Sequence, residues 1–315
     1  MKKLQLLLRL VAVLSFFLVV IFFASPQTRA QEVVAVYPDG AGSIVKYRVS
    51  DGSEISRIQQ LYRLGNTIYK PSKIAVDSSA YYVVFGDRFL ARLRASDGAI
   101  LWVVDAGLSI GITTYFVADI AVAGGNVFLC NYDPGRRIAK FRVSDGALVW
   151  SIQYGIQEGW VRQLPVKLAA VGSDSFFALV GYKFLTKIRQ SDGAVLFQVN
   201  IAVTSFLTTW NFGDLTVGGG FEYTSNLDPL GTVRKFDDSG ALVWQRSQLY
   251  RVGFFWYLPT KLAAVGSDPV MVLFGDRYLA RMRAIDGQIL WTKDIGLPTG
   301  YTPTVPTDIA AIGAP

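Results

Sequence analysis

The chain has 315 residues, of which 51% are hydrophobic and 13% aromatic, so it is long enough to bury a large core in a single all-β domain. It contains no histidine and one cysteine, which removes the commonest general base, the usual zinc ligand, any Ser-His-Asp triad and any intramolecular disulfide. The formal net charge is +7, and positive charge spread along the whole chain does not indicate a nucleic-acid partner.

The first thirty residues have the pattern of a secretory signal. A basic start, MKKLQLLLR, precedes an apolar run from Leu10 to Ala24, and the small-residue ending Thr28-Arg29-Ala30 comes before Gln31. We therefore predict a signal peptide over residues 1–30 and a secreted or periplasmic domain over residues 31–315, which carries a formal charge of +3 and no stable membrane span. An uncleaved membrane anchor is the alternative, because the apolar run can be counted back past Arg9.

The rest of the chain repeats one pattern six times. Each copy contains a turn segment such as RLRASDG or KFRVSDG that ends in glycine, and these glycines lie 46 to 48 residues apart, at Gly52, Gly98, Gly146, Gly193, Gly240 and Gly287. A charged residue follows each glycine by 21 residues, at Lys73, Asp119, Lys167, Asp214, Lys261 and Asp308. Because this residue alternates between lysine and aspartate, the true period is about 94 residues, and the chain consists of three copies of a two-unit block.

Within one unit, short apolar runs alternate with turn signals. In residues 73–105 the runs KIAV, YYVVF, LARLRA and AILWVV are separated by DSS, GD and SDG. Asp-Gly and Ser-Gly between apolar runs are typical of tight hairpins, since glycine adopts positive φ without steric cost. Four short strands per unit predict an all-β fold, namely a six-bladed β-propeller of four-stranded blades with pseudo-threefold symmetry.

The two ends of the chain predict how the ring closes. The mature chain begins with EVVAVYPDG, which aligns with NVFLCNYDP from residue 126, and it finishes with DIAAIGAP, which aligns with DIAVAGGN at 119–126. The first unit therefore lacks its opening strand, and the C-terminus stops where that unit begins. An open solenoid would need capping units, so we expect the C-terminal strand to complete the first blade as its innermost strand.

A family resemblance supports the same fold. The segments SDGAILW, SDGALVW, SDGAVLF, DSGALVW and IDGQILW resemble the tryptophan-bearing repeat of quinoprotein-like (PQQ) propellers, and PSKIAVDSSAYYVVF resembles the repeat of six-bladed NHL-type propellers. Quinoprotein enzymes use adjacent cysteines with an acidic calcium site, or a catalytic histidine, and this chain has neither set. The recurrent Trp102, Trp150, Trp244 and Trp291 are interpreted as packing residues between blades.

One candidate site is the ring of alternating charges. Lys73, Asp119, Lys167, Asp214, Lys261 and Asp308 begin the expected innermost strands, near the mouth of the central channel. The alternation lets every lysine meet an aspartate on either side, so we expect a closed circuit of inter-blade ion pairs. The alternative is a site at the channel mouth for a polar ligand or ion.

The second candidate site is the face that carries the connections between blades, which are long and aromatic. Its expected binding residues are Tyr115, Trp160, Trp210, Trp256 and Tyr301. Aromatic, partly charged surfaces of this kind are typical of carbohydrate or peptide recognition, although aromatic residues there can also fill gaps between blades.

These observations predict a non-catalytic binding or scaffold propeller that recognises a protein or a glycan, with no catalytic residue, metal site or cofactor. The alternative is a quinone- or calcium-dependent enzyme of the propeller kind, for which PQQ or calcium would be the cofactor.

Overall fold

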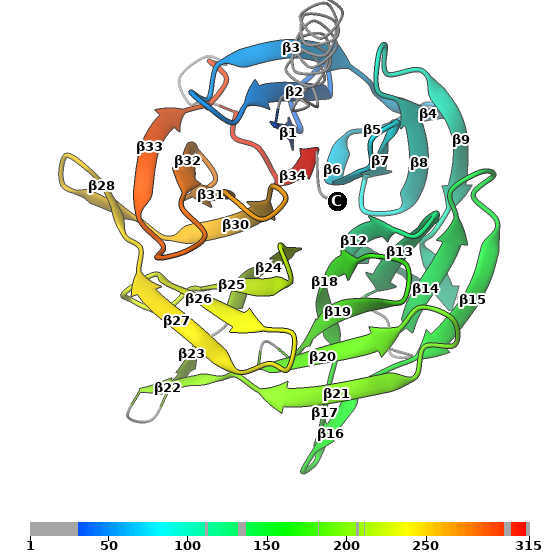
Figure 1. Cartoon of the computed structure of the whole chain (residues 1–315). Helices are drawn as coiled ribbons and strands as arrows, with labels where there is room; N and C mark the ends of the chain where they lie inside the picture. The colour runs from blue at the N-terminus through cyan, green and yellow to red at the C-terminus, as the bar shows by residue number, and fades with distance from the viewer. Residues whose placement is uncertain are drawn as a thin grey trace, which may run out of the picture.

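Six four-stranded antiparallel sheets stand around a central channel as the blades of a propeller (Figure 1). This computed structural model describes residues 31–110, 113–131, 137–181, 183–205, 208–210, 212–298 and 304–312. The predicted six-bladed, all-β fold is confirmed, whereas the predicted signal peptide over residues 1–30 lies outside the described residues. The described part of the chain has no helix that is long and apolar enough to cross a membrane.

Each blade runs from an innermost strand beside the channel to an outermost strand at the rim. The innermost strands of blades 1 to 6 are β34 (Asp308–Ile312), β6 (Pro71–Val76), β12 (Val117–Ala123), β18 (Pro165–Val171), β24 (Phe212–Gly218) and β30 (Pro259–Ala264). The second strands are β1 (Glu32–Val36), β7 (Ala80–Phe85), β13 (Asn126–Asn131), β19 (Ser175–Val180), β25 (Phe221–Asn226) and β31 (Val270–Phe274).

The outer half of each blade contains the turn segment with the repeated glycine. The third strands are β2 (Ser43–Arg48), β8 (Phe89–Arg94), β14 (Arg137–Arg142), β20 (Phe184–Arg189), β26 (Thr232–Asp237) and β32 (Tyr278–Met282). The outermost strands are β3 (Glu54–Gln59), β9 (Ile100–Asp105), β15 (Leu148–Gln153), β21 (Val195–Asn200), β27 (Leu242–Ser247) and β33 (Ile289–Asp294).

The ring closes as the sequence predicts. Strand β34 pairs antiparallel with β1 in a register that joins Glu32 to Ile312 and Val36 to Asp308. The C-terminal strand is therefore the innermost strand of the first blade. This pairing covers the inner edge of β1, which would otherwise present unpaired backbone groups.

The hydrophobic core is divided among the interfaces between blades. Every side chain of β7 (AYYVVF) and of β19 (SFFALV) is buried, because each second strand has a blade packed against both of its faces. Six clusters of buried residues fill the six interfaces, one between each pair of neighbouring blades. The long apolar runs that mark second strands in the sequence follow from this burial on two sides.

Blade 5 departs from this pattern. Its second strand, β25, has the sequence FEYTSN, and its Glu222, Thr224, Ser225 and Asn226 are at most 1% exposed. Polar atoms of all four side chains have no hydrogen-bond partner among the described residues. Burial of polar groups without partners costs free energy, so the interfaces of this blade are the least well satisfied that the structure describes.

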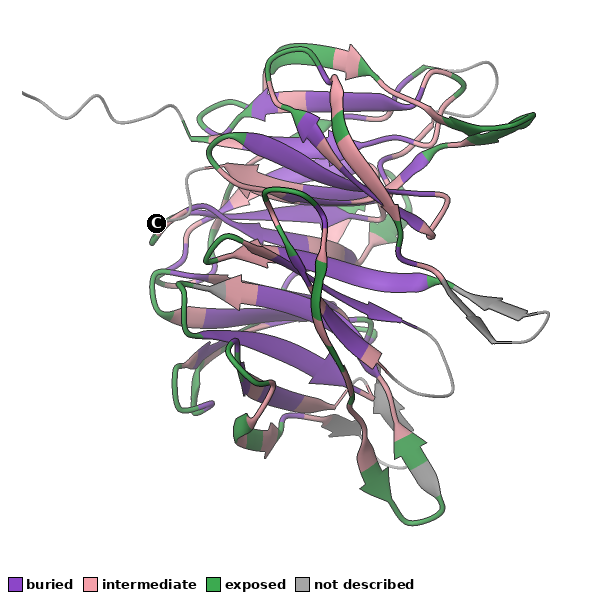
Figure 2. Cartoon of the chain, turned by 90° about the vertical axis from the view of Figure 1, so that its right-hand side faces the viewer, coloured by how far each residue is buried: buried purple, intermediate pink, exposed green. Residues whose placement is uncertain are grey.

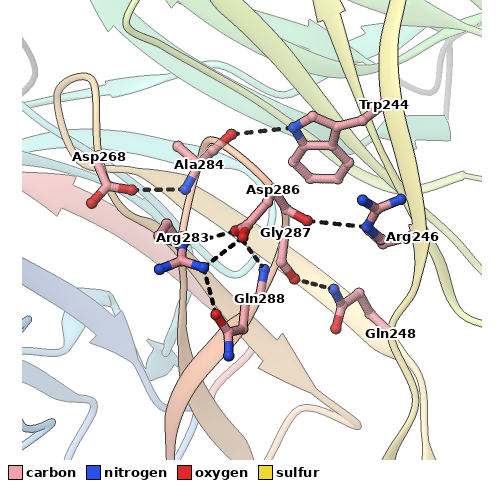
Figure 3. Close-up of polar contacts among 9 residues, drawn as sticks. All are labelled: Trp244, Arg246, Gln248, Asp268, Arg283, Ala284, Asp286, Gly287 and Gln288. Carbon is pink, nitrogen blue, oxygen red and sulfur yellow. Dashed lines mark hydrogen bonds and ion pairs between the residues drawn. The ribbon is translucent and has the colours of Figure 1, made fainter.

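At the rim, a tryptophan in the outermost strand joins its blade to the next one. Figure 3 shows this seam between blades 5 and 6, where the Trp244 Nε1–H donates to the Ala284 carbonyl oxygen at 3.2 Å. The same bond joins Trp102 to Val143 at 2.9 Å and Trp150 to Gln190 at 3.2 Å. The repeated tryptophans are thus packing residues between blades, in agreement with the sequence.

The repeated turn glycine lies against this tryptophan. Gly146 adopts a φ of 72°, and a Cβ atom placed on it would lie 2.8 Å from the ring of Trp102. A side chain at this position would therefore meet both backbone strain and a steric clash. The glycine of the SDG motif is therefore required both by the turn and by the contact with the tryptophan of the neighbouring blade.

Five connections between blades form two-stranded hairpins. They are β4 (Tyr62–Leu64) with β5 (Thr67–Tyr69), β10 (Leu108–Ile110) with β11 (Thr113–Tyr115), β16 (Ile156–Glu158) with β17 (Val161–Gln163), β22 (Val203–Ser205) with β23 (Thr208–Trp210), and β28 (Tyr250–Val252) with β29 (Phe255–Tyr257). Figure 2 shows hairpins projecting from one face of the ring, to the right in that view. The innermost strands begin on this face, so it is also the face with the charged ring at the channel mouth.

Candidate functional site

The charged ring is positioned by an irregularity shared by five innermost strands. In β6, β12, β18, β24 and β30, the pairing with the second strand shifts register just before the lysine or aspartate. The bulge places one extra residue ahead of the charged one, for example Ser72 before Lys73 and Ala118 before Asp119. Bulges of this kind redirect the following side chain.

The three aspartates of the ring bond to backbone. The Oδ2 atom of Asp119 accepts a hydrogen bond from the Leu168 N–H at 2.9 Å, and Asp214 accepts one from the Leu262 N–H at 2.8 Å. All three carboxylates are buried. Each one connects its innermost strand to the residue that follows the lysine of the next blade, so it links the two blades directly.

The lysines do not form the closed circuit that the sequence predicts. Only Lys167 contacts an aspartate on each side, with its Nζ 3.0 Å from Asp214 Oδ1 and 3.8 Å from Asp119 Oδ1. Lys73 contacts Asp87 at 3.6 Å, and Lys261 has no ion-pair partner within 4 Å among the described residues. The expected circuit is wrong because the short aspartate side chains turn to the neighbouring backbone, while the longer lysines extend toward the channel mouth.

Burial and neighbouring charges shift the pKa values of Asp119, Asp308 and Lys167. It raises the pKa of Asp119 to about 6, although the Lys167 ammonium acts in the opposite direction. Burial likewise raises the pKa of Asp308. Burial opposes the charge of Lys167, but the carboxylates of Asp119 and Asp214 outweigh it and raise the pKa of this ammonium well above its ordinary value.

Two cavities lie along the channel axis. The inner one has a volume of about 120 Å³ and is lined by the aspartates and by apolar residues of the innermost strands. The outer one, of about 430 Å³, is at the mouth on the hairpin side, and its charged lining residues are Lys73, Asp87, Lys167 and Lys261. The aspartates thus line the inner cavity and the lysines line the outer one.

The turn that carries Asp87 is fastened to the bulge. The Asp87 N–H donates to the Ser72 hydroxyl at 3.3 Å, and this hydroxyl donates to the Val84 carbonyl oxygen at 3.0 Å. Asp87 adopts a φ of 55°, which is unusual for a residue other than glycine. These contacts hold its carboxylate near Lys73.

The hairpin face carries the largest exposed aromatic side chains. Trp160 is 101% exposed, and at the next but one hairpin Phe254, Phe255 and Trp256 are 91%, 70% and 58% exposed. The guanidinium of Arg251 lies 5.3 Å from the centre of the Trp256 ring. We call the exposed apolar residues of these hairpins the hairpin-tip surface, which consists of Leu64, Ile68, Trp160, Val252, Phe254, Phe255 and Trp256.

Aromatic residues at the bases of the hairpins have a different role. The rings of Tyr62 and Tyr69 lie 4.9 and 4.8 Å from that of Phe89, centre to centre. Tyr250 and Tyr257 contact Tyr278 in the same way, at 5.1 and 4.9 Å. The alternative that aromatic residues fill gaps between blades therefore holds for the bases and not for the tips.

The remaining residues of the predicted aromatic site are only partly described. Tyr115 ends β11 and Trp210 ends β23, both at the bases of hairpins, and Tyr301 lies outside the described residues. The described chain contains no group of three His, Cys, Asp or Glu side chains that could hold a metal ion.

A comparison with protein families shows to which family the chain belongs. A family model for PQQ-type repeats, described as "Outer membrane protein assembly factor BamB", matches residues 40–216, which is more than half of the chain. The chain belongs to this BamB-like family. The PQQ-type resemblance of the SDG-x-x-x-W segments is thereby confirmed, whereas no curated protein matches the chain.

Several solved structures are similar to this BamB-like chain. BamB from Moraxella catarrhalis is 18% identical, with a TM-score of 0.46 over 82% of this chain and 69% of its own length. A protein of unknown function from Bacteroides caccae is 12% identical, with a TM-score of 0.60 over 90% and 99% of the two chains. The propeller domain of Cps50 (Swd1) from Myceliophteria thermophila is 9% identical, with a TM-score of 0.55 over 83% of each. The last two share the fold with this chain.

The sequence contains a signal for the hairpins of this BamB-like propeller. Gly65, Gly159 and Gly253 each lie at a hairpin tip with a φ between 55° and 61°. They are spaced by the same double repeat of about 94 residues as the lysines. A turn glycine at this spacing inside the aromatic connections would have predicted hairpins in place of loops.

Proposed function

We propose that this chain is a non-catalytic scaffold outside the cytoplasm, which binds a protein partner through the hairpin-tip surface. The observation that carries the proposal is the exposure of Trp160, Phe254, Phe255 and Trp256 on hairpins that project from one face. Removal of apolar surface from water is favourable by about 25 cal/mol per Å², so a partner that covers these side chains gains binding free energy. Tryptophan and other aromatic residues are also the side chains that contribute most to protein interfaces.

The charge of the hairpins favours a partner with an acidic surface. In the five hairpins, the only acidic residue is Glu158, which pairs with Lys183, whereas Arg63, Arg162 and Arg251 are basic. Arginine next to exposed aromatic side chains is typical of the core of protein interfaces. We therefore propose an acidic and partly apolar protein surface as the partner.

Two further observations support a protein over a glycan and a place outside the cytoplasm. The family model that matches the chain is named for an outer membrane protein assembly factor. Residues 1–30 have the composition of a secretory signal. We propose that they are removed and that residues 31–315 act in the periplasm or outside the cell.

Site-specific photo-crosslinking in living cells tests the proposal. A crosslinking amino acid at position 160 or 256 should give discrete protein adducts, and the same group at Ser96 should not, because Ser96 is an exposed residue in a turn at the opposite face. In a further variant, with the crosslinker at 254, Trp160→Ala and Trp256→Ala should reduce the adduct. Equal adducts at positions 96, 160 and 256 would argue against the proposal. So would binding of the purified domain to a glycan array or to phospholipid vesicles without any protein adduct.

A further inference from the structure

Each double repeat contributes one lysine to the ring, and all three lysines line the cavity at the channel mouth. We propose that this cavity binds a compact polyvalent oxyanion, with its carboxylate or phosphate oxygens held by the ammonium groups of Lys73, Lys167 and Lys261. This site is separate from the hairpin-tip surface and does not depend on the proposed protein partner.

The fold brings the three ammonium groups to one place. Each lysine is the third residue of an innermost strand that begins with proline, at Pro71, Pro165 and Pro259. Each also follows the bulge that turns its side chain away from the regular pleat. Since blades 2, 4 and 6 alternate around the ring, the three lysines approach the channel axis from three directions, which suits a ligand with several acceptor oxygens.

The lysines have donors to spare. An ammonium group carries three N–H donors, yet the described residues offer few acceptors to these three groups. Lys167 has one close contact, at 3.0 Å to Asp214, and the contact of Lys73 with Asp87 is longer, at 3.6 Å. Lys261 has no hydrogen-bond or ion-pair partner among the described residues, although it lines the same cavity.

The aspartates of the ring take up only part of this capacity, because Asp119 and Asp214 lie within 4 Å of Lys167 and not of Lys73 or Lys261. One oxygen of each carboxylate accepts a backbone N–H of the neighbouring blade, from Leu168, Leu262 or Ile74. These carboxylates line the inner cavity, beneath the lysines. Among the described residues that line the outer cavity, Asp87 is the one acidic residue against three lysines, so the lining itself carries a net positive charge.

The size and the walls of the cavity limit the ligand. A volume of about 430 Å³ lies in the range of small-molecule sites. Its other walls are apolar, from residues such as Phe116, Val166 and Leu227. Apolar walls lower the local dielectric constant and so strengthen the attraction between ammonium groups and an oxyanion. We expect a di- or trivalent anion to bind much more tightly than a monovalent one.

Isothermal titration calorimetry on the mature domain, at low ionic strength, tests the site with citrate, inorganic phosphate and acetate as probes. We expect citrate or phosphate to bind and acetate to bind only weakly. Tighter binding of citrate would indicate a polycarboxylate ligand, and tighter binding of phosphate would indicate a phosphate ligand. Lys261→Gln should weaken binding by about tenfold or more, because it removes one of three ligating charges. This variant should still fold, since Lys261 forms no ion pair within 4 Å among the described residues, although its charge favours the ionised form of the buried Asp308; the melting temperature of the variant checks this.

Two other variants make the test independent of that substitution. Asp87→Asn removes the acidic lining residue and should tighten binding severalfold, whereas Lys70→Gln should change nothing. Lys70 is an exposed lysine that donates to the Pro38 carbonyl oxygen and does not line the cavity. The proposal is overturned if neither citrate nor phosphate binds at millimolar concentration. It is also overturned if Lys261→Gln binds as tightly as the parent, or if Lys70→Gln and Lys261→Gln weaken binding equally.

Discussion

The Asp308 carboxylate accepts a hydrogen bond from the backbone N–H of Ile74 at 2.9 Å, although 234 positions separate the two residues in the chain. The same contact joins Asp119 to Leu168 and Asp214 to Leu262 within the continuous part of the ring. The blade completed by the C-terminal strand is therefore linked to its neighbour in the same way as the others. Closure depends on this side chain as well as on the pairing of β34 with β1.

Substitution of Asp308 should separate the role of the acceptor from that of the charge. Asp308→Ala leaves the buried Ile74 N–H without an acceptor, which costs about 1 to 3 kcal/mol. Asp308→Asn keeps a side-chain oxygen and should cost less, because burial already disfavours the charged carboxylate and raises its pKa. Urea unfolding of the three proteins measures the order of stability. An asparagine variant as unstable as the alanine variant would show that the charge is what matters.

The seam at the rim offers a matched pair of tryptophans. Trp244 donates its Nε1–H to Ala284, whereas the Nε1–H of Trp291 has no partner among the described residues. Replacement of tryptophan by phenylalanine removes the same part of the side chain at both positions, but it removes a hydrogen bond only at position 244. We expect Trp244→Phe to cost about 1 kcal/mol more than Trp291→Phe. Equal losses in chemical denaturation would mean that the bond to Ala284 contributes nothing.

The sequence predicts blade number, closure and the packing role of the tryptophans because each depends on a residue pattern that recurs along the chain. The arrangement of the charged ring is different. Lys73 and Asp119 occupy the same position in the repeat and follow the same bulge, so their unequal side-chain lengths decide that one lines the mouth while the other bonds to backbone. The spacing of residues does not show such contacts between blades.

Burial of Glu222 should make stability depend on pH. Burial, assisted by the Asp238 carboxylate, raises the pKa of Glu222 to about 8. The folded state therefore keeps a proton that the unfolded state loses near its ordinary pKa of about 4.5. The contribution of protonated Glu222 to the free energy of unfolding is therefore fully present below about pH 4.5. It is lost as the pH rises toward about 8, by up to about 1.4 kcal/mol per pH unit.

Glu222→Gln should remove most of this slope. Urea midpoints measured at pH 5, 6.5 and 8 should fall less in the variant than in the parent, with the remaining fall due to Asp119 and Asp308, whose pKa values burial also raises. Glu54→Gln, at an exposed residue that pairs with Arg57, is the control and should keep the slope of the parent. Parallel curves for parent and Glu222→Gln would show that Glu222 is charged in the folded state.

The exported protein should begin at or near Gln31. The ending Thr28-Arg29-Ala30 fits a signal peptidase site, and the first strand starts at Glu32 with no linker. Intact-mass spectrometry of the protein recovered after export decides this. A mass that includes residues 1–30 would indicate that the segment is kept as a membrane anchor.

Stability should separate the tips of the hairpins from their bases. Trp160, Phe255 and Trp256 are mostly exposed, so replacing all three by alanine should change the free energy of unfolding by only about 0.5 kcal/mol per site. Phe89 is 3% exposed and packs on Tyr62 and Tyr69 at the base of β4 and β5. Phe89→Ala should therefore cost about 3 to 5 kcal/mol. If the triple variant instead loses several kcal/mol in thermal melting, its aromatic residues pack between blades, and a partner-binding role for the hairpin-tip surface would lose its basis.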